Sequence, residues 1–116
     1  MVEDDETVRL FMRDVLTQYG YMVLEASQPI EALQVAEEHA SAIDLLLTDV
    51  VMPGMNGVEL SRRLLSLRPG VKVIFASGYA DSVMLHHGVS DSGAAFLPKP
   101  YGPATLATKI REVLGR

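Results

Sequence analysis

Apolar residues recur along this chain at helical spacing in four segments. Residues 7–19 carry an apolar residue every three or four positions, which is the spacing of one helix face, and Gly20 follows as a stop. Pro29 fits the first position of a second helix, and Pro103 fits the first position of the last one. Asn56 is the expected cap of a third. The pattern therefore predicts helices over 7–19, 29–38 and 57–67, and a last helix that begins at 103.

Short, continuous apolar runs lie between these helical segments. Runs of this kind are typical of strands that are buried on both faces of a parallel sheet. The clearest is LLLT at 45–48, and VKVIFAS at 71–77 and AAFLP at 94–98 follow it. MVLEA at 22–26 indicates a further strand.

Strands that alternate with helices predict crossover connections and a parallel sheet that helices cover on both faces. The helix at 7–19 should also follow a strand, yet only Met1 and Val2 precede a run of acidic residues. We therefore expect the sequence to begin inside its first strand. The expected fold class is α/β, a doubly wound parallel sheet in one domain over residues 1–116.

Composition narrows the classes of function. The chain of 116 residues has no cysteine, which excludes disulfide scaffolds, thiolate zinc sites and cysteine nucleophiles. A net charge of -5 argues against a broad grip on nucleic acid or on an anionic membrane. No apolar run approaches the roughly 20 residues that span a bilayer, and the acidic start MVEDDE is unlike a signal peptide. We expect a soluble, cytoplasmic domain.

Polar residues follow the predicted strands where each strand ends. Ligands of an open parallel sheet bind outside the carboxyl ends of its strands, so these positions are the candidates for chemistry. Crowded carboxylates need a hard cation, and Mg²⁺ prefers carboxylate and phosphate oxygens. A lysine and a hydroxyl group suit the remaining oxygens of a phosphoryl group. The residues at these ends are Glu3, Asp4, Asp5, Asp49, Ser77 and Lys99.

In this arrangement the whole chain resembles the receiver domain of two-component response regulators. The segment DVVMPG matches the family pattern of an acceptor aspartate followed four residues later by proline, which makes Asp49 the phosphoacceptor. Counting back from Arg9, a frequent arginine of the family, makes Asp4 the direct Mg²⁺ ligand and Glu3 its water-mediated companion. Asp5 falls one place beyond this pair.

The resemblance implies roles for four further positions. Lys99-Pro100 is the family's lysine-proline pair, which usually has a cis peptide bond, and the lysine pairs with the phosphoryl group. Ser77 is the switch hydroxyl and Phe96 the switch aromatic residue. The main-chain oxygen of Val51 completes the metal coordination. The implied fold is flavodoxin-like, with five parallel strands in the order 2-1-3-4-5.

The function implied is that of a phosphorelay component. Asp49 would take a phosphoryl group from a phosphohistidine of a histidine kinase or of a phosphotransfer domain, with Mg²⁺ as cofactor. Binding of this group by Lys99 and Ser77 would remodel the face around the fourth helix and fifth strand for a downstream partner. The domain would turn over no external substrate and bind no nucleic acid directly. The segment IDLLLTDVVMPGMNG is most similar to receivers of hybrid sensor kinases, and we expect that origin.

More ordinary roles are open to the same residues. An acidic N-terminal surface, a turn-forming aspartate and plain turn chemistry at MPG would each account for one part of the pattern. Among rival families, a haloacid-dehalogenase-type phosphatase needs a second aspartate where Val51 stands. A flavodoxin-like electron carrier needs a hydroxyl- and glycine-rich loop where this chain has acids. A degenerate receiver used only for docking would not need the intact acceptor set.

The crossover between Ser77 and Lys99 departs from the family. Only residues 81–87 have helical character, because Gly88 and the turn formers SDSG follow. The sequence predicts a helix of at most two turns and then an irregular segment.

Overall fold

The computed structural model describes residues 1–52, 54–77 and 95–115. The predicted helix at 81–87 lies outside this part of the chain. None of the helices in the described ranges has the length and apolarity to cross a membrane. The helices and strands are α1 (Glu6–Gln18), α2 (Pro29–Glu38), β1 (Leu45–Asp49), α3 (Gly57–Leu67), β2 (Lys72–Ser77), β3 (Ala95–Pro98) and α5 (Pro103–Leu114).

The three strands form a parallel sheet in the order β1-β2-β3. Leu45 pairs with Lys72 at one end of the register, and Ser77 pairs with Pro98 at the other. Because all the strands run in one direction, their carboxyl ends share one edge of the sheet. Residues that follow β1, β2 and β3 are thereby brought close together.

The strand expected at 22–26 does not form, and the five expected strands are three among the described residues. What remains of the other two is a pair of isolated parallel bridges, from Val2 to Ala26 and from Val2 to Thr48. A strand needs a neighbour along its length, and the segment beside 22–26 consists of Met1–Glu3 only. Apolar character alone therefore did not produce a strand at this position.

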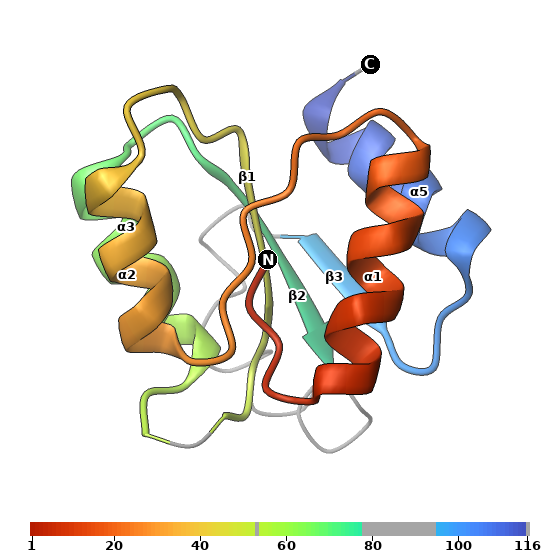
Figure 1. Ribbon diagram of the computed structural model, residues 1–116, viewed down its shortest axis with the longest axis horizontal. Helices are drawn as coiled ribbons and strands as arrows, with labels where there is room; N and C mark the ends of the chain where they lie inside the picture. Colours follow the sequence, from red (N-terminus) through yellow and green to blue (C-terminus); the bar gives the residue numbers. More distant parts are fainter. Residues whose placement is uncertain (53, 78–94, 116) are drawn as a thin grey trace.

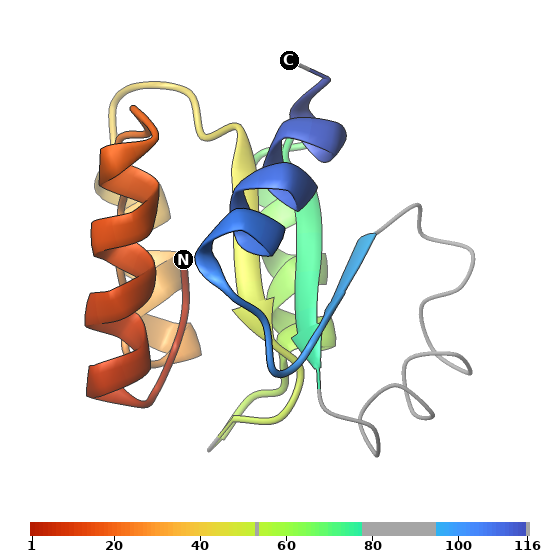
Figure 2. The same ribbon diagram turned by 90° about the vertical axis from the view of Figure 1, so that its right-hand side faces the viewer.

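Helices cover both faces of the sheet, with α2 and α3 on one face and α1 and α5 on the other (Figures 1 and 2). Consecutive residues of β2 point to opposite faces. Ile74 belongs to the apolar cluster beneath α1 and α5, whereas Phe75 belongs to the one beneath α2 and α3, and neither is exposed. The apolar runs at 45–48 and 71–77 therefore contain strands with two buried faces, as predicted, whereas only Leu97 of β3 is buried.

The helix boundaries follow their capping residues. The Asp5 carboxylate accepts a hydrogen bond from the Val8 N–H at 3.0 Å, and α1 begins and ends one residue before its predicted limits. The Asn56 side chain caps α3 in the same way. Pro29 and Pro103 stand in the first turns of α2 and α5, as expected.

One side chain also closes the carboxyl end of α2. The half-buried Arg68, which follows α3, donates hydrogen bonds to the carbonyl oxygens of Ala36, His39 and Ser41 at 2.9, 2.6 and 2.8 Å. The last carbonyls of a helix have no partner within the helix. Arg68 satisfies the carbonyl of Ala36 in the last turn and that of the cap residue His39, and its bond to Ser41 joins the loop between α2 and β1 to the end of α3.

Candidate functional site

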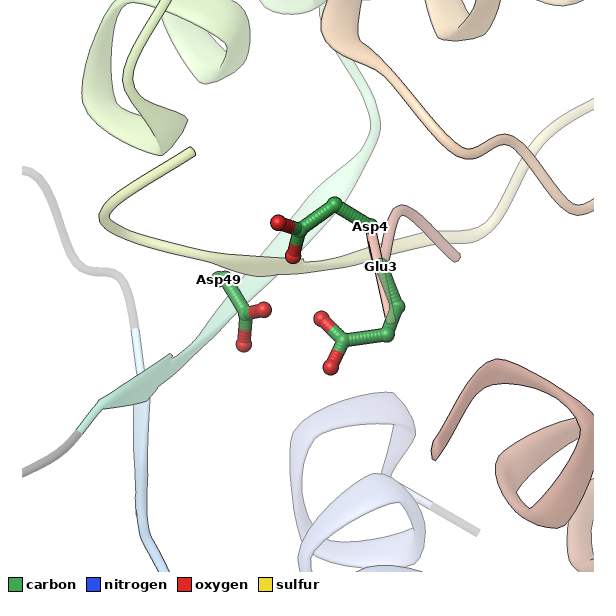
Figure 3. Close-up of side chains that lie close together, drawn as sticks. All are labelled: Glu3, Asp4 and Asp49. Atoms are coloured by element: carbon green, nitrogen blue, oxygen red, sulfur yellow. The ribbon is translucent and has the colours of Figure 1, made fainter. Parts of the chain in front are cut away.

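Three carboxylates meet at the carboxyl edge of the sheet (Figure 3). Asp49 is the last residue of β1, and Glu3 and Asp4 follow Val2, which bridges to the neighbouring residue Thr48. One oxygen of each carboxylate lies within 4.8 Å of the others. Glu3 and Asp49 are buried, whereas Asp4 is exposed to solvent. The topology therefore joins acids that are more than forty residues apart in sequence.

Lys99 supplies the opposite charge. Its Nζ atom lies 2.7 Å from Oδ1 of Asp49, whose side chain is only 10% exposed. The peptide bond between Lys99 and Pro100 is cis, as the resemblance implied. The acid and the amine predicted from two different strand ends are thus in direct contact.

The carboxylates interact strongly with one another. Burial raises the pKa of Glu3 from 4.5 to about 8, and a hydrogen bond with Asp49 and the charge of Asp49 act in the same direction. The Oε2 atom of Glu3 is buried and has no hydrogen-bond partner among the described residues. A buried polar atom without a partner is costly unless an ion or water satisfies it. The oxygen donors and their excess negative charge fit Mg²⁺.

Asp5, the acid beyond the predicted pair, is not part of this group. Its side chain caps α1 through Val8 instead. Arg9 holds the acidic segment in place, because its guanidinium donates to the Glu3 carbonyl at 3.0 Å and lies 3.6 Å from Glu25. Arg9 therefore has a structural role beside the site.

Sequence reasoning missed two residues that position Asp49. The Thr48 hydroxyl donates to the Asp49 carbonyl at 3.0 Å. Gly57, the first residue of α3, approaches so closely that a Cβ atom there would overlap the same carbonyl oxygen, and its N–H donates to the Val50 carbonyl at 2.7 Å. The only signal in the sequence was a glycine at the first helical position after the Asn56 cap.

The other predicted residues lie near the same edge. Ser77 is the last residue of β2. The half-buried Phe96 stacks on Phe75, with ring centroids 6.2 Å apart. Val51 follows β1 and is 57% exposed. Their roles in switching and in metal coordination stay predictions.

Residues 1–111 match the sequence profile of the response regulator receiver domain. The chain belongs to this family. It is 40% identical over 114 residues to the sensor kinase CckA of Brucella abortus (strain 2308), a match that covers 98% of this chain and 12% of that kinase. It is 32% identical to the response regulator receiver protein CpdR of the same organism, over 98% of this chain and 93% of CpdR.

A solved structure gives the same result. The receiver domain from the hybrid histidine kinase CckA is 38% identical, with a TM-score of 0.74, over 97% of this chain and 94% of that one. The chain is therefore a receiver domain of two-component systems, with a flavodoxin-like α/β fold. Because the chain belongs to the receiver family, we no longer consider the phosphatase and the electron carrier as alternatives.

Proposed function

We propose that this receiver domain accepts a phosphoryl group on Asp49 from a phosphohistidine of a histidine kinase or a phosphotransfer domain. One observation carries the proposal: the buried Asp49 carboxylate lies within 4.8 Å of two further acids and 2.7 Å from the Lys99 ammonium group. Asp49 thus has an ammonium group in contact with it and two further carboxylates beside it. This arrangement suits the transfer of a highly charged group.

Glu3, Asp4 and Asp49 would hold Mg²⁺, with the Val51 main-chain oxygen as a further ligand. The metal supplies positive charge that offsets the repulsion between a carboxylate and the oxygens of a phosphoryl group. The unpartnered Oε2 of Glu3 supports this assignment, because it is a buried acceptor next to the other two acids.

The side chains then have distinct tasks in the transfer. An Asp49 oxygen attacks phosphorus in line as the bond from phosphorus to the donor imidazole nitrogen breaks, which leaves an acyl phosphate on Asp49. Lys99 exchanges its contact with the carboxylate for one with a phosphoryl oxygen, and the Ser77 hydroxyl donates to another. Phe96, which stacks on Phe75, would then change its packing and alter the outer face of β3.

The finer features of the domain belong to the same proposal. The bridges that join Ala26, Val2 and Thr48 support a five-stranded sheet in the order 2-1-3-4-5. The domain turns over no external substrate, lies in the cytoplasm and binds its partners through protein contacts. The identity with CckA favours a hybrid sensor kinase as the parent protein. The 93% coverage of CpdR favours a stand-alone regulator as the second candidate.

Intact-mass spectrometry after incubation with acetyl phosphate tests the proposal. The wild-type domain should gain one phosphoryl group in the presence of Mg²⁺ and none with a chelator. Asp49→Asn should gain none, and Asp4→Ala should lose the response to Mg²⁺. Asp14→Asn, which changes an exposed acid of α1, is the matched control and should behave like wild type. Equal labelling of the Asp49→Asn variant and the wild type would disprove the assignment.

A further inference from the structure

Two of the three acids of the site, Glu3 and Asp4, come from one short segment of the chain. Figure 3 shows their carboxylates directed toward Asp49. The segment lies between the bridge at Val2 and the α1 cap at Asp5. Neither acid belongs to a helix or to one of the three strands, so other contacts must hold their main chain in place.

The main chain of Glu3 is bound on both sides. Its N–H donates to the Ala26 carbonyl at 3.1 Å, and its carbonyl accepts a hydrogen bond from the Arg9 guanidinium at 3.0 Å. This carbonyl belongs to the planar peptide group that joins Glu3 to Asp4. The orientation of one peptide group therefore affects the positions of both carboxylates.

Glu25 holds the Arg9 side chain in this position. Nε of Arg9 lies 3.6 Å from Oε1 of Glu25. Arg13, one turn further along the same face of α1, contacts the other oxygen, Oε2, at 3.5 Å. The side chain of Arg9 is 17% exposed and that of Glu25 is 31% exposed, so water screens this pair less than a fully exposed one.

The charge of Glu25 has a second consequence for the acids. The fork of an arginine can bind a carboxylate through two hydrogen bonds. If Arg9 bound Glu3 or Asp4 in this way, it would occupy oxygens that a metal ion needs and would repel the ion. Instead, Arg9 binds the main chain and pairs with Glu25, and Oε2 of Glu3 has no hydrogen-bond partner among the described residues.

We propose that Arg9, Glu25 and Arg13 are positioning residues for the binding of Mg²⁺, and that Glu25 acts through Arg9. The proposal rests on the Mg²⁺ site proposed for the three acids. Because Arg9 fixes the peptide group between two ligands before the ion arrives, less order has to be gained on binding. Loss of these residues should therefore weaken the binding of Mg²⁺ but hardly change phosphoryl transfer once the site is saturated.

Calorimetric titration of the metal-free domain with Mg²⁺ tests the proposal without a phosphoryl donor. Arg9→Leu should raise the Kd for Mg²⁺ roughly tenfold, and Glu25→Gln should raise it roughly three- to tenfold. Because Glu25 acts through Arg9, the double variant should bind Mg²⁺ no more weakly than Arg9→Leu alone. Arg13→Gln should have a smaller effect than Glu25→Gln, since Arg9 then keeps its partner.

Glu59→Gln is the matched control, because Glu59 also contacts two arginines. Arg62 lies 3.3 Å and Arg63 3.2 Å from its carboxylate, and all three residues belong to α3. This variant loses the same charge as Glu25→Gln in a similar arrangement, but not beside the acids. It should bind Mg²⁺ as the wild type does.

The rate of labelling by acetyl phosphate gives a second readout. In Glu25→Gln the Mg²⁺ concentration at half the maximal rate should rise in proportion to the Kd, whereas the rate at saturating Mg²⁺ should stay within about twofold of the wild type. A merely destabilised domain would not separate these two quantities. If the wild type itself were not labelled at Asp49, the proposed function would fail, while the calorimetric comparison would still decide the roles of Arg9 and Glu25.

The Kd of Glu25→Gln decides the proposal, because glutamine keeps the size of the side chain and removes its charge. A Kd equal to that of the wild type would overturn the proposal, even if Arg9→Leu did not fold. Additive effects in the double variant would overturn the action of Glu25 through Arg9. A rise in Kd of the same size in Glu59→Gln would also contradict the proposal, since the effect would then be one of net charge.

Discussion

Replacing Gly57 with alanine tests how closely α3 approaches Asp49. The added Cβ would overlap the Asp49 carbonyl oxygen and lie 3.0 Å from the carbon of that carbonyl and 3.2 Å from the Val50 Cα. All three neighbours are main-chain atoms, so no side chain can move aside. Either α3 or the end of β1 must shift.

The change in stability that Gly57→Ala causes follows from two opposing effects. Alanine in a helix is ordinarily more favourable than glycine by about 0.5–1 kcal/mol. Overpacking costs about 1–3 kcal/mol, so Gly57→Ala should destabilise the domain by about 1–2 kcal/mol. For a domain of this size the unfolding midpoint should fall by roughly 3–10 °C. Because the shift moves the nucleophile, labelling by acetyl phosphate should slow by roughly ten- to a hundredfold.

Gly70→Ala is the matched control. A Cβ at Gly70 would meet no atom within 4 Å, and its backbone does not require glycine. This variant should match the wild type in both the unfolding midpoint and the labelling rate. If Gly57→Ala also matched the wild type in both measurements, the proposed positioning of Asp49 by α3 would be refuted.

Three further predictions concern single side chains. Arg68→Ala should lower the free energy of unfolding in urea by about 1–2 kcal/mol, because three carbonyls lose a charged donor. Arg62→Ala, which changes an exposed residue, should lower it by less than about 0.5 kcal/mol, and equal losses in the two variants would contradict the capping role. Because Glu3 binds its proton more tightly in the folded state, the stability of the metal-free domain should fall as the pH rises from about 4.5 to about 8. In denaturation at a series of pH values, Glu3→Gln should reduce this dependence of stability on pH, and an unchanged dependence would contradict the raised pKa. Lys99→Ala should slow labelling by acetyl phosphate at least tenfold but leave Mg²⁺ binding measurable by calorimetry. The control Lys109→Ala should change neither measurement, and labelling at full rate without Lys99 would refute the role of this lysine.

Local signals in the sequence predicted the helices well. Asp5 and Asn56 cap their helices through hydrogen bonds to residues three positions away, and Pro29 and Pro103 fix the first turns. All of these contacts are short in sequence, so spacing and residue type are sufficient to find them.

The strands, and residues such as Gly57 and Arg68 that hold neighbouring segments in place, depend on partners far away in sequence. The apolar run at 22–26 looks like a strand, but it pairs only where Met1–Glu3 lies beside it. Likewise, nothing next to Gly57 shows that the Asp49 carbonyl lies against it, and nothing next to Arg68 shows the end of α2. The acids and Lys99 could be predicted because topology alone brings strand ends together.

Peptide-level mass spectrometry of the domain labelled with acetyl phosphate and Mg²⁺ tests the central assignment most directly. Trypsin separates the peptide 14–62, which contains Asp49, from residues 1–9, which contain Glu3 and Asp4. Fragmentation of the labelled peptide should place the phosphoryl group on Asp49. A phosphoryl group on any other residue, in either peptide, would contradict the assignment of Asp49 as the acceptor.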